Sequence, residues 1–109
     1  MKKGGTLKGL ILADPWFAGS QNYAQEAKVR WGGEISWRTA TSFDASKALI
    51  EALSGKNPTR ATVLQNLRFI YLASTETSGK PVQFSAIGEM FRDPVLIKAV
   101  RRDFKLVQL

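Results

Sequence analysis

The stretch of sequence that decides the fold is Thr41-Ser-Phe-Asp-Ala-Ser-Lys-Ala-Leu-Ile-Glu-Ala-Leu53. Its apolar residues recur at helical spacing, which predicts an amphipathic helix that Gly55 ends. The stripe expected to be buried consists of Phe43, Ala45, Leu49, Ile50, Ala52 and Leu53. Asp44, Lys47 and Glu51 fall on the opposite side, where they are expected to pair and to face water. Asp44 is also interpreted as an acid at the helix start that stabilises the helix dipole.

Strand and helix units precede this main helix. Residues 7–13 are largely apolar and stop at Asp14-Pro15, which predicts a short buried strand, because proline cannot donate to a ladder. A helix is expected from Ser20 to Trp31, with Gly32-Gly33 as its left-handed stop. Residues 34–38 are predicted to be a second short extended segment that leads into the main helix.

After the main helix the pattern changes from helical to β. Thr59 is expected to cap a shorter amphipathic helix. Residues 68–72 are rich in β-formers, residues 74–80 form a polar loop, and residues 82–84 alternate before a turn at Gly88. Residues 94–109 predict a terminal hairpin.

The composition limits the classes of function. A chain of 109 residues is one domain at most, and 44% hydrophobic with 23% charged residues is typical of a globular protein. Cysteine and histidine are absent, which excludes disulfides, thiolate metal sites and Cys- or His-based catalysis. Catalysis would have to rest on carboxylates, lysine or tyrosine. We therefore expect no enzyme, no metal and no cofactor.

The charge suggests an alternative function. Sixteen Lys and Arg against nine Asp and Glu give +7, which favours nucleic acid or an anionic surface if the charge is focused on one face. The run from Lys98 to Lys105, with Phe104 among its basic residues, could stack on and neutralise a single strand. A charged hairpin tip that protects an edge strand explains them equally well. No nucleic-acid motif accompanies the charge, so a solvated basic protein is the simpler interpretation.

Several motifs follow one another in a fixed order. A strand ends in Asp14-Pro-Trp-Phe17, a helix carries Phe43-Asp-Ala45, and a strand is formed by Ser78-Gly-Lys-Pro-Val-Gln-Phe84. This order resembles the C-terminal part of the type I periplasmic ligand-binding proteins, which serve ABC importers of branched-chain amino acids and amides. Relatives commonly show Tyr-Asp-Ala in the helix and Gly-Pro-Ile/Val-x-Phe in the strand. The closing hairpin resembles the family's ending, with Asp103 where glycine is usual.

The resemblance implies an α/β fold that is an incomplete portion of the type I periplasmic-binding-protein fold, with strand-helix units followed by a small antiparallel C-terminal hairpin. Such proteins have two lobes joined by hinge strands, and they enclose a small ligand when the lobes close. By this resemblance the chain is a single partial domain. Residues 1–36 would be a strand-helix unit of the second lobe, residues 37–42 the hinge crossover, and residues 43–109 helices and C-terminal β segments.

Four residues are candidates for contact with a ligand. Trp16 and Phe17 follow the carboxyl end of a strand, where ligands bind in open α/β sheets, although they could simply cap the sheet edge. Trp37 and Arg38 lie where the resemblance places the hinge. Arg38 could hold a ligand carboxylate with its planar guanidinium, although a surface arginine beside a packed tryptophan is the simpler interpretation.

The resemblance also implies partners and a location. The expected ligand is a small molecule such as an amino acid, the expected protein partner is an ABC permease, and nucleic acid is the less favoured partner. The relatives are periplasmic, but the apolar run at residues 10–13 is too short for a signal peptide, so the chain as written would stay cytoplasmic. We expect a truncated or excised fragment of a non-enzymatic solute-binding protein, not competent alone, that self-associates through apolar surface its relatives bury.

Overall fold

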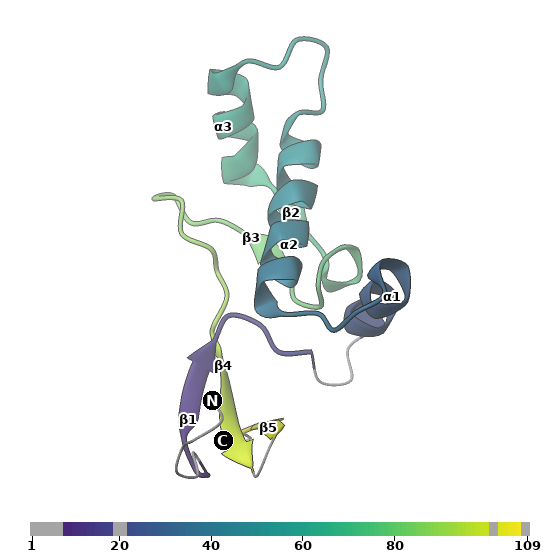
Figure 1. Cartoon of the computed structure of the whole chain (residues 1–109). Helices are drawn as coiled ribbons and strands as arrows, with labels where there is room; N and C mark the ends of the chain where they lie inside the picture. Colours follow the sequence, from purple (N-terminus) through teal and green to yellow (C-terminus); the bar gives the residue numbers. More distant parts are fainter. Residues whose placement is uncertain (1–7, 19–21, 101–102, 108–109) are drawn as a thin grey trace.

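The computed structural model describes residues 8–18, 22–100 and 103–107, and Figure 1 shows two bodies joined by two extended connections. One body, sheet A, is antiparallel with the strand order β1-β4-β5, formed by β1 (Ile11–Asp14), β4 (Val95–Val100) and β5 (Asp103–Leu106). The other, the helical body, contains α1 (Asn22–Trp31), α2 (Trp37–Ala52), α3 (Arg60–Phe69), β2 (Tyr71–Leu72), the 3-10 turn η1 (Ser74–Glu76) and β3 (Val82–Gln83).

The molecule is elongated. Its principal extents are 56 × 32 × 25 Å and its radius of gyration is 16.9 Å. A compact domain of this length has a radius of gyration of roughly 13 Å. The two bodies therefore do not share one core.

Helix α2 begins earlier than the sequence predicts. Ser36 takes the extended conformation of an N-cap residue, and the helix starts at Trp37. The extended segment predicted for residues 34–38 is therefore wrong at its end, because Trp37 and Arg38 are helical. No helix breaker separates Ser36 from Thr41, and the Thr41 hydroxyl donates to the carbonyl of Trp37 at 2.9 Å inside the helix.

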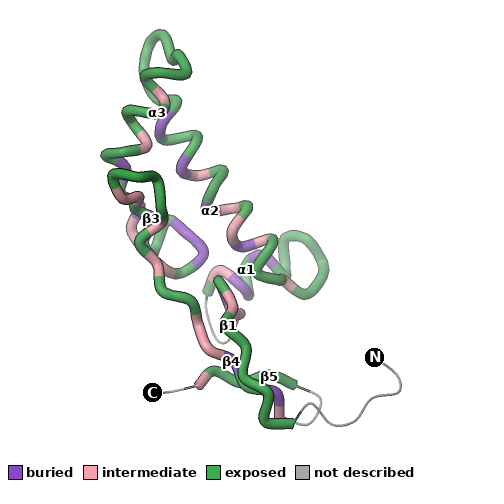
Figure 2. Tube along the Cα trace, turned by 90° about the vertical axis from the view of Figure 1, so that its left-hand side faces the viewer, coloured by how far each residue is buried: buried purple, intermediate pink, exposed green. Residues whose placement is uncertain are grey.

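The buried face of α2 agrees with the predicted one only at Ala52. It consists of Ala40, Asp44, Ala48 and Ala52, whereas Leu49, Ile50 and Leu53 are 48%, 67% and 48% exposed. Figure 2 shows this buried stripe along the helix. Small side chains at i, i+4 spacing let other elements approach closely, and Ala48 packs in one cluster with Ile70, Leu72 and Val82.

Several predictions for the second half are confirmed. Thr59 caps α3, because its hydroxyl accepts from the amide of Thr62 while the Thr62 hydroxyl accepts from the amide of Thr59. The C-terminal hairpin forms as β4 and β5. The β-rich stretch at residues 68–72 is only partly a strand, since α3 continues to Phe69 and β2 covers two residues.

Strand β1 exists but is not buried. It pairs with β4 in antiparallel register, from Ile11 opposite Lys98 to Asp14 opposite Val95. Leu10, Ile11 and Leu12 are 42%, 52% and 39% exposed. The prediction of a buried strand is wrong because the described helices gather in the other body and none of them covers β1 (Figures 1 and 2).

Candidate functional site

The junction between the two bodies is the most distinctive place in the structure. Residues 15–18 leave β1 for the helical body, and residues 90–94 return to β4. An Asp-Pro pair marks the sheet end of each connection. The pairs are Asp14-Pro15 and Asp93-Pro94, and they lie close together because Asp14 is opposite Val95. A cavity of about 270 Å³ lies here, lined by Ala13, Asp14, Pro15, Thr41, Met90, Arg92, Asp93 and Pro94.

A buried carboxylate lies on the helical side of this junction. Asp44 is buried. It accepts hydrogen bonds from the amide and hydroxyl of Ser78, at 2.7 and 2.6 Å, and from Nη1 of Arg92 at 2.8 Å. A buried charge is tolerated only when it is paired and hydrogen-bonded, and three donors satisfy that condition. The interpretation of Asp44 as a helix-start acid is therefore wrong, since it lies about two turns into α2 and faces inward.

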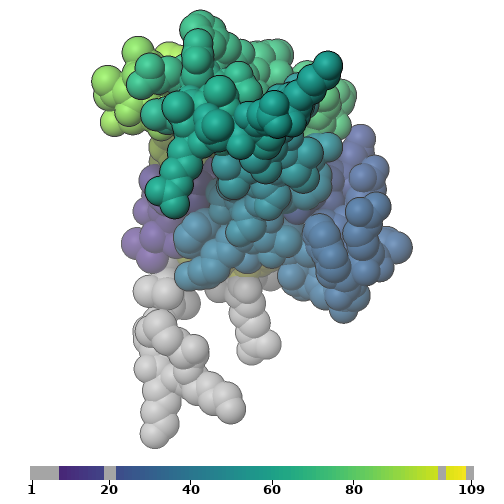
Figure 3. Space-filling model, turned by 90° about the horizontal axis from the view of Figure 1, so that it is seen from above, coloured from purple at the N-terminus to yellow at the C-terminus, as the bar shows by residue number. Residues whose placement is uncertain are grey.

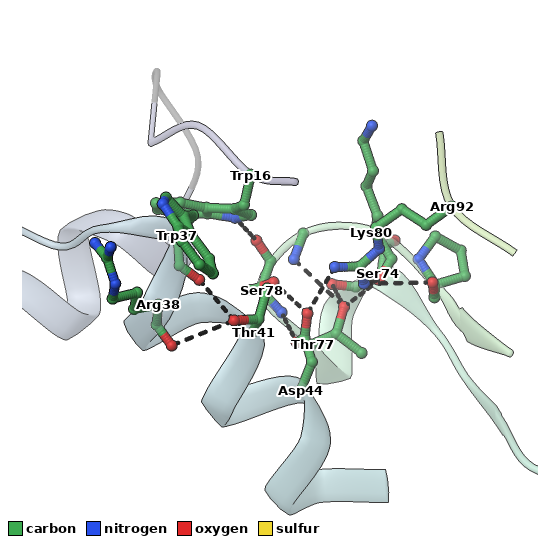
Figure 4. A network of polar contacts seen from close by, with 12 residues as sticks. Trp16, Trp37, Arg38, Thr41, Asp44, Ser74, Thr77, Ser78, Lys80 and Arg92 are labelled. Carbon is green, nitrogen blue, oxygen red and sulfur yellow. Dashed lines mark hydrogen bonds and ion pairs between the residues drawn. The ribbon is translucent and has the colours of Figure 1, made fainter. Parts of the chain in front are cut away.

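The same cluster holds both connections. Trp16, in the first connection, donates its indole N–H to the carbonyl of Ser78 at 2.8 Å. Arg92, in the second connection, donates Nη2 to the carbonyl of Lys80 at 2.9 Å. Figure 4 shows these contacts converging on the loop at residues 77–80. Asp44 and Ser78 thus fix the points at which both connections enter the helical body.

The four predicted ligand residues lie in two different settings. Trp16 is only 4% exposed, and its ring meets Tyr23 edge-to-face at 6.0 Å between centroids. Phe17 is half-buried beside it. Trp37 and Arg38 are exposed in the first turn of α2, where the Arg38 guanidinium lies 4.6 Å from the Trp37 ring centroid. Trp16 packs in one cluster with Ala40, so the two pairs lie near the same end of α2 (Figure 4).

A larger cavity lies between α1, α2 and η1. Its volume is about 630 Å³, and it is lined by Asn22, Tyr23, Glu26, Phe43, Lys47, Ser74, Thr75, Glu76, Thr77 and Gly79. The Tyr23 ring contacts Phe43 at 4.7 Å between centroids. Burial raises the pKa of the Tyr23 phenol above 10.0, and the Asp44 charge raises it further. The Tyr23 hydroxyl is buried and has no hydrogen-bond partner among the described residues.

None of the four predicted residues lines either cavity. Sequence reasoning missed Ser78 and Arg92 and misread Asp44. Spacing along the chain could not link Asp44 to Arg92, which lies 48 residues away. One signal was present, because Asp44 stands between Ala40 and Ala48 at i±4, so it shares any face on which these alanines are buried.

The described residues offer no obvious metal site or membrane span. Among them no group of three acidic, Cys or His side chains is arranged to hold a metal ion. None of the three described α-helices has the length and apolarity that crossing a bilayer requires.

Comparison with known proteins gives one informative result. No protein-family model matches the sequence, and no curated protein matches it significantly. The crystal structure of the leucine-binding protein LivK from Thermotoga maritima superposes with a TM-score of 0.79 at 13% sequence identity, and the match covers 94% of this chain and 31% of that one. The fold is an incomplete portion of the type I periplasmic-binding-protein fold. The chain spans about a third of the length of its structural neighbour.

Proposed function

We propose that this chain is the C-terminal part of a solute-binding protein of an ABC importer, which captures an amino acid or amide without enzymatic chemistry. The observation that carries this proposal is the structural match over 94% of the chain to a leucine-binding protein. The proposal includes a periplasmic location and an ABC permease as partner. Capture takes place when the two lobes of the complete protein close on the ligand.

The two connections are the proposed hinge segments. They run side by side between sheet A and the helical body, as strands joining two lobes must. The hinge predicted at residues 37–42 is replaced in this proposal by residues 14–18 and 90–94, because residues 37–42 are the first turns of α2. Tyr23 of α1 contacts Phe43 of α2, so α1 belongs with the helical body in this proposal and not with sheet A.

Arg38 and Trp37 are the proposed ligand contacts that remain accessible. Arg38 makes no ion pair with any described residue, and its guanidinium is stacked on Trp37, which leaves its planar donors oriented for a carboxylate. Trp16 and Phe17 would form the apolar wall behind them. In this assignment Trp16 acts mainly through its ring faces, because its indole N–H is already bonded to Ser78.

The test is a titration of the full chain with L-leucine, L-glutamate and acetamide, followed by tryptophan fluorescence and by the thermal midpoint. Because much of the enclosing surface lies outside these 109 residues, the chain is not expected to capture its ligand competently alone. We expect only a residual, saturable binding of L-leucine with a Kd of about 1 mM or weaker. Arg38→Gln should abolish the response. Arg30→Gln, an exposed arginine on α1, is the matched control and should leave it unchanged.

Tryptophan variants show which side chain gives rise to the fluorescence change. Trp37→Phe should remove most of the fluorescence change, and Trp31→Phe, which alters another exposed tryptophan, should not. A chain that shows no saturable response to any of the three compounds up to about 50 mM would contradict the proposed function.

Binding to an anionic polymer is the second candidate, and one feature favours it. Lys98 and Lys105 lie directly opposite each other across β4 and β5, and both are exposed. Affinity for single-stranded oligonucleotide should then fall steeply between low and physiological salt. Affinity that is insensitive to salt eliminates this candidate.

A further inference from the structure

The cavity of about 630 Å³ in the helical body has one wall from each of three elements. Asn22 and Glu26 come from α1, Phe43 and Lys47 come from α2, and residues 74–77 form the third wall. A spacing of four residues places each helical pair on one side of its helix. Helix α1 lies beside the N-terminal half of α2 (Figure 1), so the two pairs border the same space.

Two aromatic rings form the apolar part of the lining. Tyr23 and Phe43 pack with 4.7 Å between their ring centroids, and both side chains are half-buried. Aromatic rings give a ligand a large apolar surface at little cost in side-chain freedom. A ligand of this cavity should therefore have one face that carries carbon-bound hydrogen.

The charged groups of the lining have opposite signs. Glu26 and Glu76 are negative and Lys47 is positive, yet no ion pair joins any of the three to another described residue. The Lys47 ammonium lies 5.9 Å from the Phe43 ring centroid, and Glu76 accepts from the amide of Ala73 at 3.0 Å. An anion would face two carboxylates here, and a cation would face an ammonium. A ligand with a single charge therefore fits only part of the lining.

Hydroxyl groups suit both signs of charge. One hydroxyl oxygen can donate its proton to a carboxylate and accept a hydrogen bond from an ammonium at the same time. Asn22, Ser74 and Thr75 are exposed residues of the lining, and their side chains offer further donors and acceptors. The lining thus combines an aromatic surface with several groups that can bond to neighbouring hydroxyls.

We infer that this cavity binds a small neutral polyhydroxylated ligand, a monosaccharide or disaccharide. Its carbon-bound face lies on Tyr23 and Phe43, and its hydroxyls bond to Glu26 and Lys47. An apolar lining with a few placed polar groups is the usual composition of a small-molecule site, and the volume lies within the usual range of about 300 to 1,000 Å³. The inference is independent of the proposed amino-acid capture, which uses other residues.

The exposure of the third wall sets the expected affinity. Ser74, Thr75 and Glu76 are exposed, so a bound ligand stays partly in water. Its hydroxyls also exchange bonds to water for bonds to protein, which yields little net free energy. The Kd for a monosaccharide should therefore be about 1 to 10 mM.

Titration of the isotope-labelled full chain with D-glucose and with maltose, up to about 100 mM, tests the inference by NMR. We expect saturable shifts of backbone amides in residues 22–26, 43–47 and 74–79, which border the cavity. Thr75→Trp places a large side chain in the cavity from an exposed position and should raise the Kd at least about tenfold. Asn57→Trp, in the exposed loop between α2 and α3, is the matched control and should leave the Kd within about twofold.

Charged probes test the choice of ligand class. Choline, acetate and glycine should shift the same amides no more than sodium chloride of equal ionic strength does. Lys47→Met should weaken glucose binding several-fold, whereas Lys56→Met, at an exposed position outside the cavity, should not. Choline, acetate or glycine binding more tightly than glucose would overturn the assignment of a neutral ligand.

Two further outcomes would overturn the site itself. One is the absence of saturable shifts with both sugars, and the other is unchanged glucose binding in Thr75→Trp. Arg38→Gln should leave glucose binding unchanged, because Arg38 does not line this cavity. The response to L-leucine is measured separately, so a failure of this inference can be told apart from a failure of the proposed function.

Discussion

Asp44 and Arg92 form a buried ion pair with 2.8 Å between Oδ2 and Nη1, and their side chains are 1% and 6% exposed. Arg92 belongs to the connection that leads to β4, whereas Asp44 lies in α2. This contact therefore holds a connecting segment against the main helix. Seen from above, the helical body presents one continuous surface, from the blue of α1 to the green of the later segments (Figure 3). Breaking this ion pair should therefore also loosen the connection to which Arg92 belongs.

Removing the charge of Asp44 should strongly destabilise the chain. Asp44→Asn leaves Arg92 buried without its counter-charge, which costs about 3 to 5 kcal/mol of unfolding free energy. Urea denaturation followed by circular dichroism measures this. Glu51→Gln, at an exposed position of the same helix, should change stability by less than about 0.5 kcal/mol. The double variant Asp44→Asn/Arg92→Met should recover part of the loss, and a single-variant loss under about 1 kcal/mol would show that the pair is not buried in solution.

Loss of the indole donor of Trp16 should also destabilise the chain. Trp16→Phe keeps an aromatic ring but leaves the carbonyl of Ser78 without this donor, and the expected cost is about 1 to 3 kcal/mol. The midpoint of thermal unfolding is the readout. Trp31→Phe changes a tryptophan that is 55% exposed and is the control. Equal shifts for the two variants would argue against the anchoring role of Trp16.

Tyr23 predicts a loss of stability at alkaline pH. Its folded pKa is raised above 10.0 by burial and by the Asp44 charge, so the unfolded state loses its phenolic proton first. Stability from this group is present below pH 10.0 and declines as pH rises toward the folded pKa. Unfolding measured from pH 8 to about 11 should show a steeper decline for the natural chain than for Tyr23→Phe.

The same variant tests the buried hydroxyl. Because this hydroxyl has no partner among the described residues, Tyr23→Phe should be neutral or stabilising by up to about 1 kcal/mol at neutral pH. A clear destabilisation would mean that the hydroxyl is hydrogen-bonded in solution.

The opposed lysines of sheet A predict a stabilising substitution. Lys105→Glu replaces a like-charge pair with an attractive one opposite Lys98, which should add about 0.2 to 1 kcal/mol at low salt. The gain should shrink as salt is added. Lys56→Glu makes the same charge change in the exposed loop between α2 and α3 and separates the local effect from that of net charge.

The parts of the fold that were predictable are those with local chemical signals. Thr59 identified the start of α3, and residues 94–109 predicted the hairpin that β4 and β5 form. The buried face of α2 was not predictable from apolarity alone, because alanines and an aspartate pack inward while Ile50 faces solvent. That choice depends on strands β2 and β3, which come later in the chain. The polar contacts of Ser78 could not be predicted for the same reason, because their partners lie far away in the sequence.

The two prolines of the junction have a mechanical consequence. Each fixes its own backbone angle and restricts the aspartate before it to extended conformations, so Asp14-Pro15 and Asp93-Pro94 act as two stiff struts set next to each other. A pair of struts resists twisting but bends readily out of the plane that contains both. Movement of the sheet relative to the helices should therefore be a rotation about one axis, which lies in the plane of the two connections and runs across them.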